Sequence, residues 1–197
     1  MTASPLILAS ESPRRKSWLE AVRVPFEVVA PQMDETPLVG ENPKEMVARL
    51  SKGKALSVVA KRPGRWVLAA DTTVAVDGRV LGKPSDEDDA VAMLGLIQGR
   101  RHLVHTGVCL AMDGDVHQFT DTAEVTIRPL SQEQIRMYVA TGEPMDKAGA
   151  YAAQGMAALF IERIDGSFSN VMGLPVERLG GLFFDLGLME PWYNFGR

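Results

Sequence analysis

The chain has 197 residues, of which 46% are hydrophobic and 23% are charged, and this composition excludes disorder as its main state. Its 21 Lys and Arg residues against 25 Asp and Glu residues give a formal net charge of −4, which argues against nonspecific binding of nucleic acid, because such binding depends on a basic surface. The single cysteine, Cys109, excludes an internal disulfide bond, and one Cys with three His argues against a structural zinc site.

The apolar run at the start of the chain, Leu6 to Ala9, is too short for a signal peptide, and no basic segment precedes it. No stretch approaches the roughly 18–20 apolar residues of a membrane-spanning helix. We therefore expect a cytoplasmic location and no contact with a membrane.

In the first half of the chain, hydrophobic runs bounded by Pro and Gly predict alternating strands and helices. The expected elements are a strand over 6–9, a helix over 13–21, a strand over 26–30, a helix over 43–60 and a strand over 66–76. Ser12 and Pro13 carry the start signal of the first helix, a side-chain acceptor at the N-cap followed by a preset φ. Asp77 and Gly78 predict a hairpin turn after the long strand.

The second half continues the alternation. The expected elements are a helix with Ser85 as its N-cap that ends near residue 99, strands over 102–112 and 116–127, a helix from Ser131 to about 140, a strand over 157–164 and a helix over 176–186. Because the Asp-Gly hairpins add antiparallel pairs to this alternation, we expect a mixed α/β layered fold, either one domain or two small lobes that share a core.

The segment from Ser10 to Arg15, Ser-Glu-Ser-Pro-Arg-Arg, joins the first strand to the first helix. Anions bind at such a junction, because free backbone N–H groups point outward at the positive end of the helix dipole. Two serine hydroxyls and two guanidinium groups favour a phosphate chain. The alternative interpretation is a capped helix with a solvated pair of arginines.

Charged residues also stand at three other candidate positions. Asp34 and Glu35 suit Mg²⁺, which uses one or two carboxylates plus substrate phosphates, and the alternative is a solvated acidic loop. Asp71 interrupts an apolar run, where a carboxylate is costly unless it is paired or bound to a metal. It is a candidate general base or metal ligand, and the competing interpretation is a structural ion pair. Lys83 is either a phosphate contact or a solvated loop lysine.

Two Gly-rich segments follow in the second half. Residues 141–155 place Asp146, Lys147, Tyr151 and Gln154 among three glycines. Gln154 offers both a donor and an acceptor, which suits recognition of a nucleobase edge. Residues 166–175 form a second Gly and Ser loop, which is a further candidate for an anion-binding turn.

Several familiar catalytic arrangements are missing from the sequence. His102 and His105 point to opposite faces of one expected strand, so they do not form a metal-binding pair. The chain has no GxSxG elbow, no P-loop and no GxGxxG fingerprint. We therefore expect neither histidine catalysis nor a Ser-His-Asp triad.

Taken in order, these motifs resemble those of the Maf family of nucleotide pyrophosphatases, which is related in fold to the inosine triphosphate pyrophosphatases. The matching pieces are Ser10-x-Ser12-Pro13-Arg14-Arg15, Asp34-Glu35, Asp71-Thr72, Gly82-Lys83-Pro84, Gly99-x-x-His102-x-Val104-x-Thr106-Gly107, residues 141–155 and residues 166–175. Each motif alone is weak, whereas the ordered set is specific. The resemblance implies a single domain over residues 1–197, with a mixed elongated β-sheet flanked by helices and two lobes around a central cleft.

The resemblance further implies hydrolysis of a nucleoside triphosphate between its α- and β-phosphates, giving a monophosphate and pyrophosphate with Mg²⁺ or Mn²⁺. By this resemblance, Asp71 is the general base or a metal-linked carboxylate, and Glu35 is a metal-associated acid. The phosphate-binding set that it implies is Ser10, Ser12, Arg14, Arg15, Lys54, Lys83 and Lys147. Cations at these positions would offset the charge of the triphosphate and of the leaving pyrophosphate.

Within the family, the residues at the positions of Arg14, Thr72 and Gln154 separate the substrate classes. This combination resembles the branch that acts on dTTP and UTP rather than the branch that prefers 7-methyl-GTP. One departure is Ala153, which stands where many relatives carry a larger aliphatic residue.

Two other functions remain open on the sequence. The family was first associated with septum formation, so one alternative is a nucleotide-binding regulator of cell division, although a pure binder has no need of Glu35 and Asp71. The other is a nucleic-acid-binding module, suggested only by the arginine pairs at 14–15 and 100–101, and the acidic net charge argues against it. The resemblance also implies a homodimer.

Overall fold

The computed structural model describes residues 5–189, so residues 1–4 and 190–197 of the expected domain lie outside the described part of the chain. One seven-stranded mixed sheet has the order β2-β1-β3-β5-β6-β7, and β4 pairs with β3. The strands are β1 (Leu6–Leu8), β2 (Phe26–Val28), β3 (Val67–Val76), β4 (Arg79–Leu81), β5 (Arg101–Met112), β6 (Asp115–Ile127) and β7 (Ile161–Asp165). The α-helices are α1 (Pro13–Ala21), α2 (Pro43–Val59), α3 (Glu87–Ile97), α4 (Gln132–Val139), α5 (Phe168–Val171) and α6 (Val176–Asp185).

The predicted mixed α/β class is confirmed, but the predictions at the start of α3 and at residues 157–160 are wrong. The N-cap of α3 is Asp86 rather than Ser85, because the Asp86 side chain accepts the backbone N–H of Asp89. Residues 157–164 are not one strand: a 3₁₀ helix, η3 (Met156–Leu159), precedes the short β7. Apolar residues at 157–160 are compatible with either element, and periodicity alone does not separate them.

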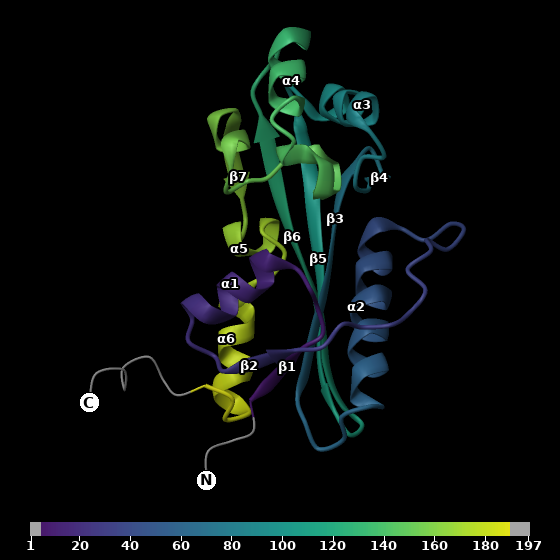
Figure 1. Ribbon diagram of the computed structural model, residues 1–197, viewed down its shortest axis with the longest axis vertical. Helices are drawn as coiled ribbons and strands as arrows, with labels where there is room; N and C mark the ends of the chain where they lie inside the picture. The colour runs from purple at the N-terminus through teal and green to yellow at the C-terminus, as the bar shows by residue number, and fades with distance from the viewer. Residues whose placement is uncertain (1–4, 190–197) are drawn as a thin grey trace, which may run out of the picture.

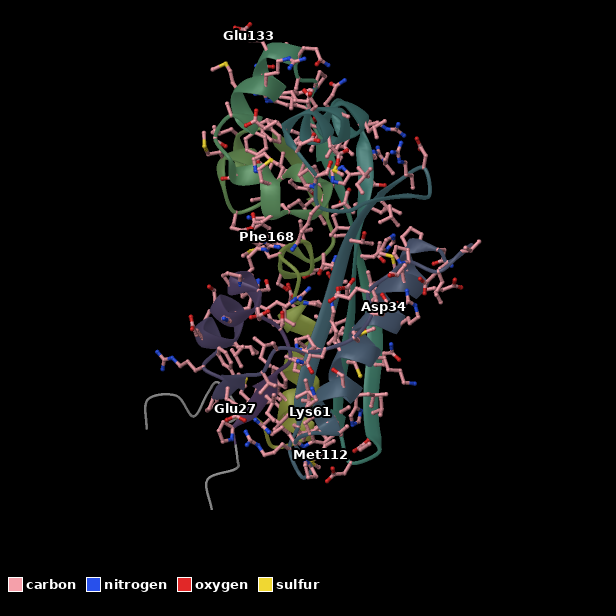
Figure 2. All side chains as sticks on the ribbon, turned by 45° about the vertical axis from the view of Figure 1, so that its right-hand side comes forward. Glu27, Asp34, Lys61, Met112, Glu133 and Phe168 are labelled. Carbon is pink, nitrogen blue, oxygen red and sulfur yellow. The ribbon has the colours of Figure 1, made fainter. Side chains whose placement is uncertain are left out.

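Long strands β3, β5 and β6 run the length of the molecule, and helices cover both faces of the sheet (Figure 1). α2 lies on one face, and α1 and α6 lie on the other near the end where β1 and β2 join the sheet. α3 and α4 lie at the opposite end, as Figure 2 shows by the label Glu133, far from Lys61 and Met112. Among the described residues, none of the helices combines the length and apolar composition that a transmembrane span requires.

The face of the sheet opposite α2 carries two separate hydrophobic clusters, one at each end. Val74 and Val104 belong to the cluster under α3 and α4. Leu68 and Val108, from the same two strands, belong to the cluster under α1 and α6. Each end of the molecule therefore has its own core, and both cores are built on the same continuous strands.

β3 has an open edge between these two cores. On that side, β1 pairs with β3 at Val67 and Leu68, and β4 pairs with it at residues 74–76. Within the described residues, neither strand flanks positions 70–73, whereas β5 pairs with β3 along the whole stretch on the other side. Asp71 and Thr72 therefore lie at an interruption of the sheet, just where the chain leaves β1 toward α1.

Close approach of α2 to the sheet depends on Gly107 in β5. A Cβ at this position would lie 2.2 Å from the backbone oxygen of Val47 in α2, which no side chain tolerates. Gly107 is also the register partner of Asp71. Lys54 follows Val47 by seven residues, about two helical turns, so the face of α2 that rests on Gly107 also presents Lys54 to the sheet.

We expect Gly107→Ala to lower the free energy of unfolding by about 1–3 kcal/mol, because the added methyl group forces α2 away from β5. Urea unfolding monitored by circular dichroism measures the change. The matched control is Gly181→Ala in α6, where a Cβ would meet nothing within 4 Å. That control is expected to raise the stability by about 0.5–1 kcal/mol, since Ala has the higher helix propensity. A Gly107→Ala protein as stable as the control would contradict the close contact.

Candidate active site

A cleft of about 440 Å³ lies at the open edge of β3. All of the catalytic, metal-associated, phosphate-binding and specificity residues that the resemblance implies contribute to its lining, although they come from widely separated parts of the chain. They are Ser10, Ser12, Arg14, Arg15, Glu35, Lys54, Asp71, Thr72, Lys83, Lys147 and Gln154. The structure therefore brings the whole candidate set together around one cavity.

One wall of the cleft is the N-terminus of α1. Ser12 occupies the N-cap, but its side chain makes no capping bond, so the expected cap is wrong in this detail. Instead, the Ser10 hydroxyl accepts the backbone N–H of Ser12 at 3.3 Å and Nη1 of Arg15 at 3.0 Å. With both lone pairs used, the Ser10 proton is available to a ligand, and the uncapped helix end leaves its first N–H groups available as well.

Arg15 is held rigidly in this wall. Its Nε donates to the backbone oxygen of Gly173 at 2.9 Å, and its two terminal nitrogens donate to Ser10 at 3.0 Å and to the Thr72 hydroxyl at 3.2 Å. Three of the five N–H groups are thus engaged, and two remain for a ligand. Burial lowers the pKa of Arg15 from its ordinary value, and the nearby Asp71 carboxylate opposes that shift. The guanidinium is a fixed cation rather than a solvated one.

Thr72 belongs to the same network, and its hydroxyl proton points away from the cleft. Thr106, its register partner on β5, donates to the backbone oxygen of Asn170 at 2.9 Å. The 3.0 Å contact between the two threonine hydroxyls therefore has Thr72 as the donor, because Thr106 has only one proton. Thr72 accepts from Arg15 and donates inward, so its hydroxyl offers a ligand an acceptor only.

Lys54 links two carboxylates on the opposite side of β3. Its Nζ lies 2.6 Å from Oδ1 of Asp71 and 2.7 Å from Oε2 of Glu35. The Lys54 side chain is 9% exposed and that of Asp71 13%, so this pair is largely removed from water, whereas Glu35 is 56% exposed. Asp71 and Thr72 are consecutive residues of a strand and face opposite sides of the sheet. Both reach the cleft because the sheet is interrupted there.

The donor set suits a hard divalent cation. Glu35 and Asp71 converge on one point, and together they outweigh the single charge of Lys54. Mg²⁺ is commonly held by one or two carboxylates and completes its shell with waters and substrate phosphates. Among the described residues, no group of three or more His, Cys, Asp or Glu side chains gathers at one point. The arrangement therefore fits an ion that enters with a phosphate ligand rather than a permanent protein cage.

The far wall of the cleft comes from the segment that follows α4. Lys147 forms an ion pair with Asp146, and Asp146 also opposes the burial that lowers the pKa of Arg14. Lys83 reaches the cleft from the loop after β4, and Gln154 from the loop before η3. Basic and acidic side chains are nearly balanced over the whole lining: Arg14, Arg15, Lys54, Lys83 and Lys147 face Glu11, Glu35, Asp71 and Asp146.

Sequence reasoning missed the pairing of His102 with Tyr151. Nε2 of His102 lies 2.8 Å from the Tyr151 hydroxyl, and Tyr151 lines the cleft. The 2% exposure of His102 lowers its pKa from 6.5 to about 4 by desolvation, so the ring is neutral near pH 7. The strand parity of His102 was visible in the sequence, but its contact with a residue 49 positions later was not.

The basic pair at 100–101 does not form a free cationic surface. Arg100 lies 2.7 Å from an Asp77 oxygen, and Arg101 lies 3.2 Å from a Glu124 oxygen. The pair at 14–15 lines the cleft. Each of the arginines that suggested nucleic-acid binding thus has an acidic partner or a place in the cavity.

His102 should make the protein less stable as the pH falls from 6.5 toward 4. In that range the unfolded chain binds a proton at this histidine and the folded chain does not, so the unfolding free energy decreases. Between pH 7 and pH 5, the unfolding free energy of His102→Gln should decrease by about 1–2 kcal/mol less than that of the wild-type protein. Urea unfolding at both pH values measures the difference. His117→Gln, at a partly exposed histidine, is the control and should keep the full loss. An identical loss in His102→Gln and wild type would contradict the assignment.

Comparison with known proteins gives a consistent result. The profile of the family described as "Maf-like protein" matches residues 5–185. The dTTP/UTP pyrophosphatase of Symbiobacterium thermophilum is 50% identical over 173 residues, which cover 88% of this chain and 89% of that protein. The dTTP/UTP pyrophosphatase of Nitratidesulfovibrio vulgaris is 45% identical over 190 residues, covering 95% and 90%. The dTTP/UTP pyrophosphatase of Sphingopyxis alaskensis is 48% identical over 185 residues, covering 93% and 97%.

A solved structure also resembles the fold. The Staphylococcus aureus Ham1 protein superposes with a TM-score of 0.50 over 93% of this chain and 100% of that chain, at 15% sequence identity. At this identity the likeness concerns the fold alone, and it agrees with the elongated mixed sheet described above.

Proposed function

The chain belongs to the Maf family, and from this premise we propose that it hydrolyses dTTP and UTP to the nucleoside monophosphate and pyrophosphate. The observation that carries the proposal is the single cleft that gathers the N-terminus of α1, the fixed Arg15 and the Lys54-linked carboxylates. Relatives that are 45–50% identical over most of this chain bear the name dTTP/UTP pyrophosphatase. A nucleotide-binding regulator without catalysis would not need a nearly buried carboxylate at the open edge of the sheet.

Phosphate binding falls to the α1 wall in this proposal. Ser10, Ser12, Arg15 and the free N–H groups of α1 hold the triphosphate, with Lys83 and Lys147 approaching from the other wall. These donors are fixed before substrate arrives, so they stabilise the charge that develops on the leaving pyrophosphate without reorganising. Burial keeps the field of Arg15 strong, because little water screens it.

Asp71 accepts the proton of the attacking water in this proposal. Lys54 orients the carboxylate at the open edge of β3 through the 2.6 Å ion pair. Glu35 and Asp71 are the residues that would bind a divalent cation, Mg²⁺ or Mn²⁺, which supplies Lewis-acid activation of water and charge neutralisation when bound. Lys54 offsets the carboxylate charge in the absence of that ion.

The nucleobase is recognised by Gln154 at the far wall and by Arg14, which extends from α1 close enough to Asp146 for their charges to interact. A glutamine amide presents a donor and an acceptor together, which matches the O4 and N3–H edge that thymine and uracil share. Cytosine carries an amino donor in place of O4, so the Gln154 donor would face another donor. Thr72 contributes to specificity through Arg15, whose guanidinium it helps to fix.

Incubation with dTTP and Mg²⁺ should release dTMP and pyrophosphate, because the cations of the cleft neutralise a pyrophosphate leaving group. Ion-exchange chromatography of the products measures this directly. A panel with UTP, dCTP, dATP and 7-methyl-GTP tests the base preference, and dTTP and UTP should be hydrolysed fastest. Orthophosphate and dTDP as products would show cleavage of the terminal bond and would refute the proposal.

Asp71→Asn should reduce kcat for dTTP by about 10²-fold or more, because an amide cannot accept the proton of the attacking water. Steady-state kinetics measures the loss, and circular dichroism confirms that the variant is folded. The control is Asp165→Asn on β7, an exposed carboxylate whose partner is Arg163 and which is remote from the cleft lining. If Asp71 serves only as the ion-pair partner of Lys54, the variant loses thermal stability and keeps a near-normal kcat.

A further inference from the structure

Gln154 depends on its backbone for its position. The residue lies between the 3₁₀ segment η2 (Ala148–Ala150) and η3, it is exposed at the cleft, and within the described part of the chain its amide forms no hydrogen bond. An unsupported glutamine on an irregular segment samples many rotamers, and ordering it on binding costs free energy. The contacts that hold residues 152–157 in place therefore determine how precisely the Gln154 amide is positioned to bind a nucleobase.

Two residues outside the cleft lining bind this segment on both sides of Gln154. Before it, the backbone N–H of Ala152 donates to the Tyr138 hydroxyl at 3.2 Å. After it, the N–H groups of Met156 and Ala157 donate to the two Glu143 carboxylate oxygens at 2.9 Å and 3.3 Å.

The same two residues are joined to each other. The Tyr138 hydroxyl donates to Oε1 of Glu143 at 2.7 Å, so a single chain of hydrogen bonds runs from Ala152 through Tyr138 and Glu143 to the start of η3. Burial and the neighbouring carboxylate raise the pKa of Tyr138, which keeps the donating proton in place. The Glu143 carboxylate accepts the first N–H groups of η3, which have no partner within that short helix.

Gly155 shows how closely the carboxylate fits. A Cβ at position 155 would lie 2.2 Å from Oε2 of Glu143, so the carboxylate fills the space that any side chain would occupy. The residue directly after Gln154 must be glycine as long as Glu143 caps η3. The carboxylate thus holds the backbone of the segment, in addition to the buried side chains of Ala152, Ala153 and Ala157.

We infer that Tyr138 and Glu143 are positioning residues that hold Gln154 in the orientation in which it selects the nucleobase. This inference rests on the proposed hydrolysis of dTTP. Neither residue lines the cleft, so they act through the backbone of 152–157 and not by touching the substrate. The phosphate-binding wall at α1 is built from other elements and is independent of them.

Glu143→Gln and Tyr138→Phe test the inference. In Glu143→Gln one carboxylate oxygen becomes an NH₂ group that cannot accept from a backbone N–H, and Tyr138→Phe removes the acceptor for Ala152. We expect each variant to lower the ratio of kcat/KM for dTTP to that for dCTP by about tenfold, since selectivity by polar groups depends on their placement. The inhibition constant of inorganic tripolyphosphate, which has no base, should stay at the wild-type value.

A double-mutant cycle separates positioning from general damage. In the Gln154→Ala background, Glu143→Gln should change the dTTP-to-dCTP ratio no further, because the residue that it positions is already gone. The matched control is Glu162→Gln on β7, an exposed glutamate outside the cleft lining, which should leave both the ratio and the tripolyphosphate constant unchanged. Unaltered selectivity in both single variants, or an equal further loss in the Gln154→Ala background, would overturn the inference.

Hydrogen–deuterium exchange gives a readout that does not need activity. The amides of Ala152, Met156 and Ala157 should exchange at least tenfold faster in Glu143→Gln or Tyr138→Phe than in wild type. Failure of wild-type protein to release pyrophosphate from dTTP would refute the proposed function, and exchange would then decide the structural part of the inference alone. Exchange at wild-type rates in both variants would refute that part as well.

Discussion

The direct contact between α2 and β5 determines most of the chemistry available at the cleft. Because residue 107 has no side chain, the helix backbone rests on the sheet itself, with the Val47 oxygen where a Cβ would be. Two turns later Lys54 reaches the carboxylate of Asp71, the register partner of that glycine. A helix farther from the sheet would leave the largely buried Asp71 carboxylate without its cationic partner, which is energetically costly. The ion pair between Lys54 and Asp71 therefore depends on the close packing of α2 against β5.

The interruption of the sheet beside β3 has a comparable effect on geometry. Along an ordinary paired strand, the side chains of Asp71 and Thr72 would be separated by the backbone and would serve different faces. Between the end of β1 and the start of the β4 pairing, both sides open into the same cavity. Lys54 thus reaches the cavity from one face of the sheet and Arg15 from the other. Binding sites at such points of changed strand connection are common in α/β proteins.

Local sequence predicted most of the elements, because the signals that mark their boundaries are local. Pro13, Pro43 and the Asp-Gly turns mark boundaries that depend on backbone chemistry alone. The candidate residues from Ser10 to Gln154 could be assembled only through resemblance to a family, since no spacing rule joins Lys54 to Asp71.

Contacts between distant segments could not be predicted. The direction of the Thr72 hydroxyl follows from Thr106 and the Asn170 carbonyl, which lie in two other elements. Tyr138 and Glu143 support Gln154 because the chain between residues 138 and 157 folds back on itself. Local sequence patterns do not reveal that arrangement. Residues 157–160 were assigned to a strand because their apolar side chains suit either element, and the Glu143 carboxylate at the start of η3 favours a 3₁₀ turn instead.

The two hydrophobic clusters on one face of the sheet have a mechanical consequence. Each wall of the cleft is anchored in its own core, yet both cores are built on β3 and β5, whose backbone hydrogen bonds continue without a break past the cavity. A change in the width of the cleft cannot be taken up by a flexible linker, and it has to appear as bending or added twist of those strands. The stiffness of the sheet then sets the energy needed to bring the α1 wall and the far wall of the cleft together.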